Sequence, residues 1–189
     1  NLMCGIAGFT HFSGNMGDKD TLKKMGDSIY HRGPDAGGEY INEHLGLAHR
    51  RLAIIDLSDA GVQPMTSHDG KYIIVFNGEI YNFQALRAEL SAAGYPFKTQ
   101  TDTEVILALY ATEGENQLNK INGMFAFALW DTTTQKLFIA RDRMGKKPLY
   151  RLDRISGRYI SLEQARNTEQ SIYGLEQSYM IDVWKILQS

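Results

Sequence analysis

The sequence has little of what several classes of protein require. It contains one cysteine among 189 residues, so no disulfide can form within the chain, as is usual in reducing compartments. No apolar run approaches the roughly 20 residues that a membrane-spanning helix needs. The amino end also lacks the basic and apolar segments of a signal peptide. We therefore expect a cytoplasmic protein that does not associate with membranes.

An excess of charge is also missing. The 20 basic and 22 acidic residues give a net charge of -2, and the isoelectric point is near 6.2. This balance argues against a general binder of nucleic acids or membrane surfaces. The five histidines lack metal-ligand spacing, and no glycine-rich phosphate loop is present. We expect no metal ion and no cofactor in this chain, and no nucleic-acid partner.

The composition is typical of one globular domain, with 43% hydrophobic and 22% charged residues. Its patterns predict strands, then two adjacent helices, then strands, which favours an α+β or layered sandwich. Predicted strands cover Cys4–Phe12, Gly38–Asn42, Leu45–His49, Leu52–Asp56, Tyr72–Phe76, Met124–Trp130, Lys136–Ala140, Pro148–Leu152 and Arg158–Leu162. Predicted helices cover Asp18–Ile29, Asn82–Ala93 and a stretch from about Asp102 to Gly114.

Several boundaries of these elements depend on single residues. The candidate helix caps are Asp18 or Asp20 for the first helix, Asn82 for the second, and Asp102 or Thr103 for the third. Asn77-Gly78 is a strong turn signal at the end of the strand 72–76. The basic segment 141–147 predicts a solvated loop. A terminal helix would place Tyr179, Val183 and Ile186 on one face.

The single cysteine, Cys4, lies close to the amino end and is followed by small residues. It is either a buried small apolar side chain, as free cysteines often are, or a reactive thiol. If Asn1, Leu2 and Met3 are removed, Cys4 gains a free α-amino group, which titrates at about 7.7–8.0 in model peptides. Such an amine could serve as a general base for its own thiol. We interpret Asn1-Leu2 as an expression scar and Met3 as the initiator.

A set of stretches, taken in order, resembles a known family. They are Cys4–Phe9, His31–Asp35, Arg50–Asp56, Gln63–Met65, Asn77–Asn82, Thr101–Ile106, Gly123–Asp131 and Arg141–Gly145. Together they resemble the glutamine amidotransferase half of glutamine-hydrolysing asparagine synthetases, a class II N-terminal-nucleophile hydrolase domain. The resemblance implies a four-layer αββα sandwich with two antiparallel sheets between helical layers.

The resemblance also implies the roles of six residues. Cys4 would be the nucleophile, and the Asn77 side chain and Gly78 N–H would form the oxyanion hole. Taken alone, Asn77-Gly78 would instead be a hairpin turn. Arg51 would bind the α-carboxylate of glutamine, although a solvated surface arginine is the simpler interpretation. Asp102 would bind the α-ammonium with Glu79 as a second acidic contact, and Asp102 could also be a helix cap.

The implied organisation is an amidotransferase type 2 domain over residues 4–150, after residues 1–3, with a divergent or truncated tail over 151–189. Its partners would be L-glutamine and a synthetase domain or subunit that receives ammonia; that domain, absent from this chain, would use ATP and Mg. The segment 141–147 would belong to the interface with it. A homodimer is a further hypothesis for the assembly of this chain.

The expected acceptor of ammonia is activated aspartate, giving asparagine. One alternative is a related amidotransferase with another acceptor, for instance in surface-polysaccharide biosynthesis. A second alternative is a non-catalytic module that binds glutamine or a partner on the same fold.

Overall fold

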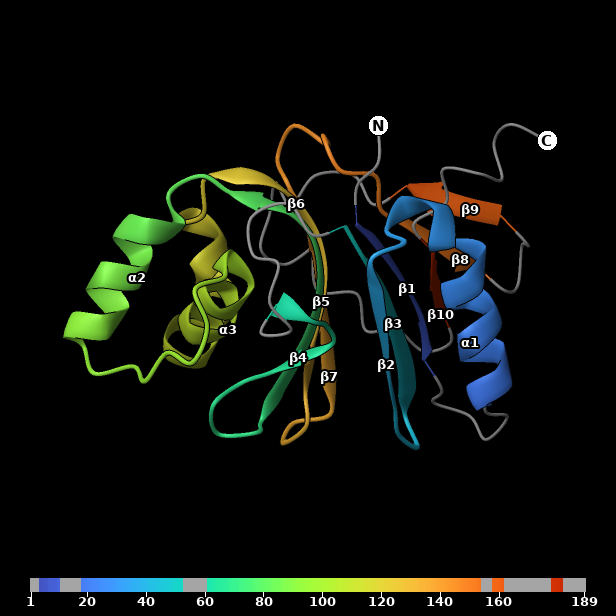
Figure 1. Cartoon of the computed structure of the whole chain (residues 1–189), viewed down its shortest axis with the longest axis horizontal. Helices are drawn as coiled ribbons and strands as arrows, with labels where there is room; N and C mark the ends of the chain where they lie inside the picture. The colour runs from blue at the N-terminus through green and yellow to red at the C-terminus, as the bar shows by residue number, and fades with distance from the viewer. Residues whose placement is uncertain (1–3, 11–17, 53–60, 154–157, 162–177, 182–189) are drawn as a thin grey trace.

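A computed structural model describes residues 4–10, 18–52, 61–153, 158–161 and 178–181. Within these residues, two antiparallel sheets face each other, and helices cover both outer faces (Figure 1). The six-stranded sheet has the order β2-β3-β1-β10-β8-β9, and the four-stranded sheet has the order β4-β5-β6-β7. Helix α1 lies on the larger sheet, and α2 and α3 lie beside the smaller one. The predicted α+β, four-layer αββα sandwich is confirmed.

The larger sheet combines strands from both ends of the chain. Its strands are β1 (Gly5–Thr10), β2 (Ala36–Ile41), β3 (Leu45–Arg51), β8 (Tyr150–Asp153), β9 (Arg158–Ser161) and β10 (Ser178–Ile181). Strand β10 lies between β1 and β8, and its residue Ile181 pairs with Ala7. Helix α1 (Lys19–Ser28) and the short 3-10 helix η1 (Tyr30–Arg32) connect β1 to β2.

The smaller sheet and its helices come from the middle of the chain. The strands are β4 (Met65–Thr66), β5 (Tyr72–Ile80), β6 (Gly123–Asp131) and β7 (Lys136–Arg141). The helices are α2 (Phe83–Ala92), α3 (Asp102–Glu113) and the 3-10 helix η3 (Gly114–Asn119). The run from Thr103 to Tyr110 is buried all round, because α3 lies between the sheet, α2 and η3.

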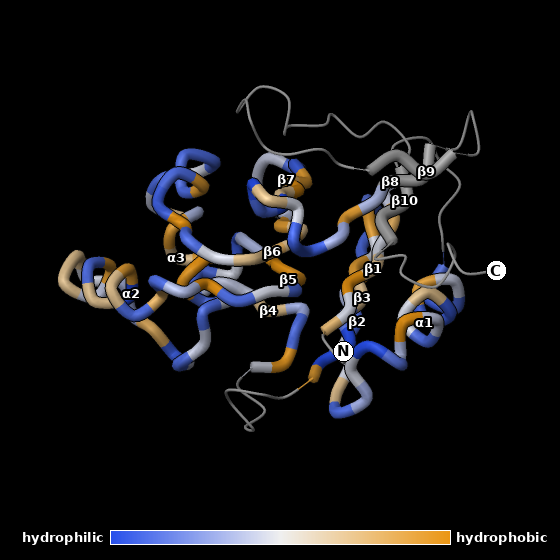
Figure 2. The backbone as a smooth tube through the Cα atoms, turned by 90° about the horizontal axis from the view of Figure 1, so that it is seen from above, coloured by the Kyte–Doolittle hydropathy of each residue, from blue (hydrophilic) through white to orange (hydrophobic). Residues whose placement is uncertain are grey.

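Two main cores follow from the period-2 alternation of the strands. Between the sheets, Ile73 and Val75 of β5 meet Ile6 and Leu47 of the larger sheet. On the other face of β5, its remaining apolar side chains pack against α2 and α3. Figure 2 shows the apolar segments of β1, β3 and β5 in these central layers. The alternation along β5 therefore decides which of its side chains reach the space between the sheets.

The turn predicted at Asn77-Gly78 is wrong, because β5 continues through both residues to Ile80. Strand β6 pairs with β5 over its whole length, and Gly78 lies opposite Phe125. A Cβ atom at Gly78 would lie 2.3 Å from the carbonyl oxygen of Met124. The glycine therefore permits close approach of two strands, whereas the local sequence had indicated a change of chain direction.

One of the three predicted helix caps forms its hydrogen bond, and a second residue has the predicted position without that bond. Asp18 caps α1, and its carboxylate accepts a hydrogen bond from the Thr21 N–H at 2.8 Å. Asn82 precedes α2 as predicted, but its side chain bonds to Lys120 and Asn122 instead of capping the helix.

At α3 the predicted caps, Asp102 and Thr103, are wrong. Thr101 is the cap and accepts from the Glu104 N–H, in the Thr-x-x-Glu spacing of a capping box. Asp102 is the first helical residue, so its carboxylate is available for another contact.

Two further predictions concern the carboxyl-terminal part. The terminal helix is wrong at Tyr179, since residues 178–181 form β10; its remainder, 182–189, lies outside the described residues. Residues 178–181 pair with β1 on one side and β8 on the other, and this backbone pairing outweighs the weak helical pattern. Of the predicted strand at 52–56, only Leu52 is described; residues 53–56 lie outside the described part of the chain.

Candidate active site

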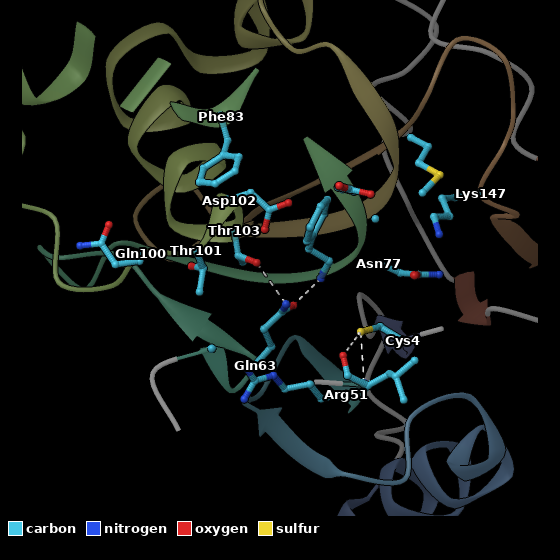
Figure 3. Close-up of a pocket in the computed structure, with 16 residues that line it drawn as sticks. Cys4, Arg51, Gln63, Asn77, Phe83, Gln100, Thr101, Asp102, Thr103 and Lys147 are labelled. Carbon is cyan, nitrogen blue, oxygen red and sulfur yellow. Dashed lines mark hydrogen bonds between the residues drawn. The ribbon is translucent and has the colours of Figure 1, made fainter. Parts of the chain in front are cut away.

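The six residues predicted for the site line one cavity of about 210 Å³ (Figure 3). They come from the residue just before β1, from the end of β3, from β5 and from the start of α3, and they are Cys4, Arg51, Asn77, Gly78, Glu79 and Asp102. Segments nearly 100 positions apart in the sequence thus meet at one end of the sandwich. The structure brings together every residue that the sequence nominated for the site.

Strand alternation explains why three of these side chains meet. Asn77 shares a strand face with Ile73 and Val75, which fill the space between the sheets. Cys4 lies two residues before Ile6, so the two side chains point to the same face of the sheet. Because Gly5 pairs with Arg50, the next residues along the two strands, Cys4 and Arg51, are also neighbours. The side chains of Asn77, Cys4 and Arg51 therefore all point into the space between the two sheets, next to the apolar core that occupies the rest of that space.

The Cys4 thiol is partly buried and contacts the backbone of Leu52. The Leu52 N–H donates to Sγ at 3.4 Å, and Sγ lies 3.7 Å from the Leu52 carbonyl oxygen. Burial raises the pKa of the Cys4 thiol, although the Leu52 N–H and the charge of Arg51 oppose this effect. The thiol is therefore protonated near neutrality, and it needs a base before it can attack a carbonyl carbon.

None of the described histidines lines the cavity, so none of them can be that base. His49 lies behind it, 1% exposed, with Nε2 at 3.2 Å from the Phe76 carbonyl oxygen. Burial lowers the pKa of His49 to about 3, so the ring stays neutral and donates to Phe76. The α-amino group that Cys4 would carry as a first residue has the appropriate basicity and proximity.

Strand β5 also presents a backbone donor to the cavity. Residues of an antiparallel strand alternate the edge to which they direct their N–H groups. The Phe125 N–H and carbonyl bond to Asp142, away from β5, so Gly78 directs its N–H to the opposite edge. Asn77, 1% exposed, lies one residue before it on the inner face. An amide side chain and a backbone N–H thus converge near the thiol, as an oxyanion site requires.

Arg51 is the last residue of β3 and is 9% exposed, so it is not a solvated surface arginine. A Cβ atom at Gly61 would lie 2.5 Å from its Nη2 atom, so the guanidinium needs a glycine beside it. A buried guanidinium with planar donors suits a carboxylate ligand. Its neighbour Arg50 points to the other face, where it bonds to the Gly26 carbonyl and Asp27 of α1.

Asp102 lies at the far end of the cavity from Cys4 (Figure 3). Its Oδ2 atom accepts a hydrogen bond from the Ile80 N–H at 3.0 Å. Burial raises the pKa of the Asp102 carboxyl, and the charge of Glu79 adds to this effect. A partly buried carboxylate beside a second acidic group favours a cationic ligand, because a nearby positive charge stabilises the ionised form and so opposes the shift.

We predict that Asp102→Asn stabilises the ligand-free domain at neutral pH by a few degrees of Tm. Because the pKa of Asp102 is raised in the folded state, this carboxyl stabilises the fold at pH values below its ordinary pKa of 3.8. That stabilisation is lost as the pH rises through the folded-state pKa. The ionised carboxylate therefore destabilises the fold at pH 7, and asparagine removes that charge. Thermal unfolding at several pH values would measure the gain, which should shrink toward pH 4.

Asp18→Asn is the matched control for this prediction, because hydrogen bonds from Thr21 lower the pKa of that exposed carboxyl. The Asp18 variant should show no gain at pH 7. An Asp102 variant that is less stable than the parent at pH 7 would contradict the argument.

Other residues of the cavity were not found by sequence reasoning. Gln63, Thr103 and Lys147 line it, and Phe83 is placed on its wall above Asp102 (Figure 3). The prediction of a solvated loop over 141–147 is wrong for Lys147, which is 3% exposed. The signal that identifies this loop as ordered is Asp142, whose carboxylate accepts N–H bonds from four residues: Phe125, Met144, Lys146 and Lys147.

Two further findings concern cofactors and membranes. In the described part of the chain, no group of three or more His, Cys, Asp or Glu side chains could hold a metal ion. None of the helices described there has the length and apolar composition that crossing a bilayer requires.

Comparison with known sequences agrees with this geometry. A sequence profile of the family described as "Glutamine amidotransferase domain" matches residues 3–170. The chain belongs to this family. The glutamine amidotransferase domain is 47% identical over 151 residues to asparagine synthetase [glutamine-hydrolyzing] 1 of Bacillus subtilis. This match covers 78% of the chain and 24% of that relative, so the chain spans about a quarter of its length.

Two other relatives widen the comparison. Amidase chry2 of Gibberella zeae is 41% identical over 160 residues, which is 78% of this chain and 24% of chry2. Among solved structures, the glutamine phosphoribosylpyrophosphate amidotransferase of B. subtilis superposes with a TM-score of 0.69 at 19% identity. That superposition covers 85% of this chain and 46% of the other chain, and it supports the N-terminal-nucleophile hydrolase fold.

Proposed function

We propose that this domain hydrolyses free L-glutamine to glutamate and ammonia, with Cys4 as the nucleophile. The observation that carries the proposal is the convergence of a thiol, two amide donors and opposed charges around one cavity. Its elements match a reaction that needs a soft nucleophile, an oxyanion site and a holder for an amino acid.

The proposed reaction begins when the free α-amino group of Cys4 accepts the proton of its own thiol. Sγ then attacks the carboxamide carbon of glutamine, and the carbonyl oxygen becomes an oxyanion held by Asn77 and the Gly78 N–H. The protonated amine donates its proton to the leaving nitrogen, which departs as ammonia. The product is a γ-glutamyl thioester on Cys4.

Water completes the cycle. The α-amino group takes a proton from the attacking water, and a second tetrahedral oxyanion forms at the same two donors. Collapse of this intermediate breaks the C–S bond, releases glutamate and returns the proton to the sulfur. One amine thus acts twice as base and twice as acid, which requires a pKa near the working pH.

Selectivity for free glutamine would come from the charges of the cavity. Arg51 would bind the α-carboxylate, while Asp102 and the more exposed Glu79 would bind the α-ammonium. A glutamine within a peptide has neither charge and would form neither of these charge-assisted contacts. We expect little activity on peptide-bound glutamine.

The ammonia would pass to a synthetase domain or subunit. The similarity to asparagine synthetases supports aspartate, activated with ATP and Mg by that other domain, as the acceptor. A different acceptor is the second candidate, since chry2, a protein named as an amidase, shares the same domain at 41% identity. Assembly as a homodimer and a cytoplasmic location stay predictions.

The direct test is glutamate release from L-glutamine by the chain with Cys4 as its first residue. Labelling of Cys4 by 6-diazo-5-oxo-L-norleucine, an electrophilic glutamine analogue, would show that the thiol is the nucleophile. A non-catalytic binding module would retain glutamine binding with neither glutamate release nor labelling, and that result would refute the proposal.

A further inference from the structure

Beyond β4, side chains take the place of a neighbouring strand along the edge of β5. The Phe76 N–H donates to Gln63 Oε1 at 2.6 Å, and the Ile80 N–H donates to Asp102 Oδ2 at 3.0 Å. Strand β4 contains only two residues and pairs with β5 no further than Ile74. The N–H of Gly78 faces the same edge, halfway between these two bonds. Gln63 and Asp102 therefore bracket the backbone donor of the oxyanion site.

Gln63 also reaches α3 through the other end of its amide. Its Nε2 atom donates to Thr103 Oγ1 at 3.2 Å, and Thr103 directly follows Asp102 in α3. Figure 3 shows the two bonds diverging from Gln63, one to the backbone of β5 and one to the helix. Gln63 and Thr103 are 5% and 3% exposed, so water does not compete freely for either bond.

Burial alone does not explain this arrangement. Gln117 of η3 is also fully buried, yet neither its Oε1 nor its Nε2 has a hydrogen-bond partner among the described residues. Gln63 differs because both amide atoms are bonded, each to a different element. Those elements carry opposite ends of the site: β5 carries Asn77 and Gly78, and α3 carries Asp102.

We propose that Gln63 is a positioning residue that fixes the distance between the oxyanion donors of β5 and the ammonium-binding carboxylate of α3. The inference rests on the proposed function, because that function assigns the two ends. Gln63 acts through Phe76 and Thr103. Without it, α3 could shift relative to β5, and a bound glutamine could not satisfy both ends of the site at once.

The test compares Gln63→Met, Thr103→Val and the double variant, each with Cys4 as its first residue. Gln117→Met is the matched control, since it makes the same replacement at a buried glutamine remote from the cavity. The measurements are KM and kcat for glutamine, and hydrogen exchange of the Ile80 amide. That amide bonds to Asp102, so its protection reports the position of α3 without any ligand.

We expect Thr103→Val to raise KM about 10-fold with kcat within about twofold, because only the helix is released. Gln63→Met should raise KM at least as much and also lower kcat several-fold, because β5 is released as well. The double variant should match Gln63→Met, and Ile80 exchange should be faster in all three. Gln117→Met should change none of these quantities.

Unchanged Ile80 exchange in Thr103→Val, or a multiplicative effect in the double variant, would overturn the inference. If Gln63→Met does not fold, Thr103→Val and its Ile80 exchange still decide the question. The proposed function fails separately, if the parent chain neither releases glutamate nor reacts with the glutamine analogue; Ile80 exchange would still measure the coupling.

Discussion

Glutamate release should increase at least about 100-fold when Cys4 becomes the first residue of the chain. Burial raises the pKa of the Cys4 thiol, so few thiolates form without a base. No described histidine lines the cavity, and His49 is buried, neutral and bonded to Phe76. A positioned general base contributes about 10²–10⁴-fold to a rate. Steady-state glutamate release, normalised to titrated thiol, would compare chains with and without residues 1–3.

The pH dependence adds a second check on this prediction. The chain that begins at Cys4 should gain kcat/KM as pH rises through about 7.7–8.0, where an α-amino group loses its proton. Cys4→Ala in the same chain is the control and should abolish release while the Tm stays close to that of the parent. Equal rates with and without residues 1–3 would contradict the role of the amine.

Replacing Arg51 by methionine should raise KM for glutamine by about 100-fold or more. Arg51 is buried beside the cavity, and loss of one partner of a buried charge pair costs about 2–5 kcal/mol. Each 1.4 kcal/mol corresponds to about a tenfold change in affinity. The effect should fall mainly on KM, because the α-carboxylate lies away from the reacting carbon. Steady-state kinetics over a wide glutamine range would separate KM from kcat.

The neighbouring residue provides the matched control for this second prediction. Arg50→Met removes the same charge from the same strand, but its side chain bonds to Gly26 and Asp27 on the opposite face. It should lower Tm and leave KM within about twofold. Arg51→Lys should recover only part of the affinity, because an ammonium cannot bind a carboxylate bidentately. Similar KM values for Arg50→Met and Arg51→Met would refute the assignment.

The sequence by itself determined the elements whose signals are local. The apolar run of β5 and the Asp18 cap of α1 are short-range patterns, and both are present in the structure. The ordered motifs also resemble a known family, and this resemblance nominated six of the residues that line the cavity. For these six residues the resemblance carried the information, because the local pattern alone left a turn, a helix cap or a surface arginine as alternatives.

Only the tertiary structure decided what depends on partners distant in sequence. Asn77-Gly78 is a turn signal in isolation, but both residues pair with β6, at Ala126 and Phe125, which lie 49 and 47 positions later in the chain. Asp102 could cap a helix, but Thr101 does so, and the Asp102 carboxylate bonds to Ile80 instead. Gln63 and Lys147 look like surface residues until folding buries them. Strand pairing and burial join residues far apart in the chain, so no local pattern could reveal these contacts.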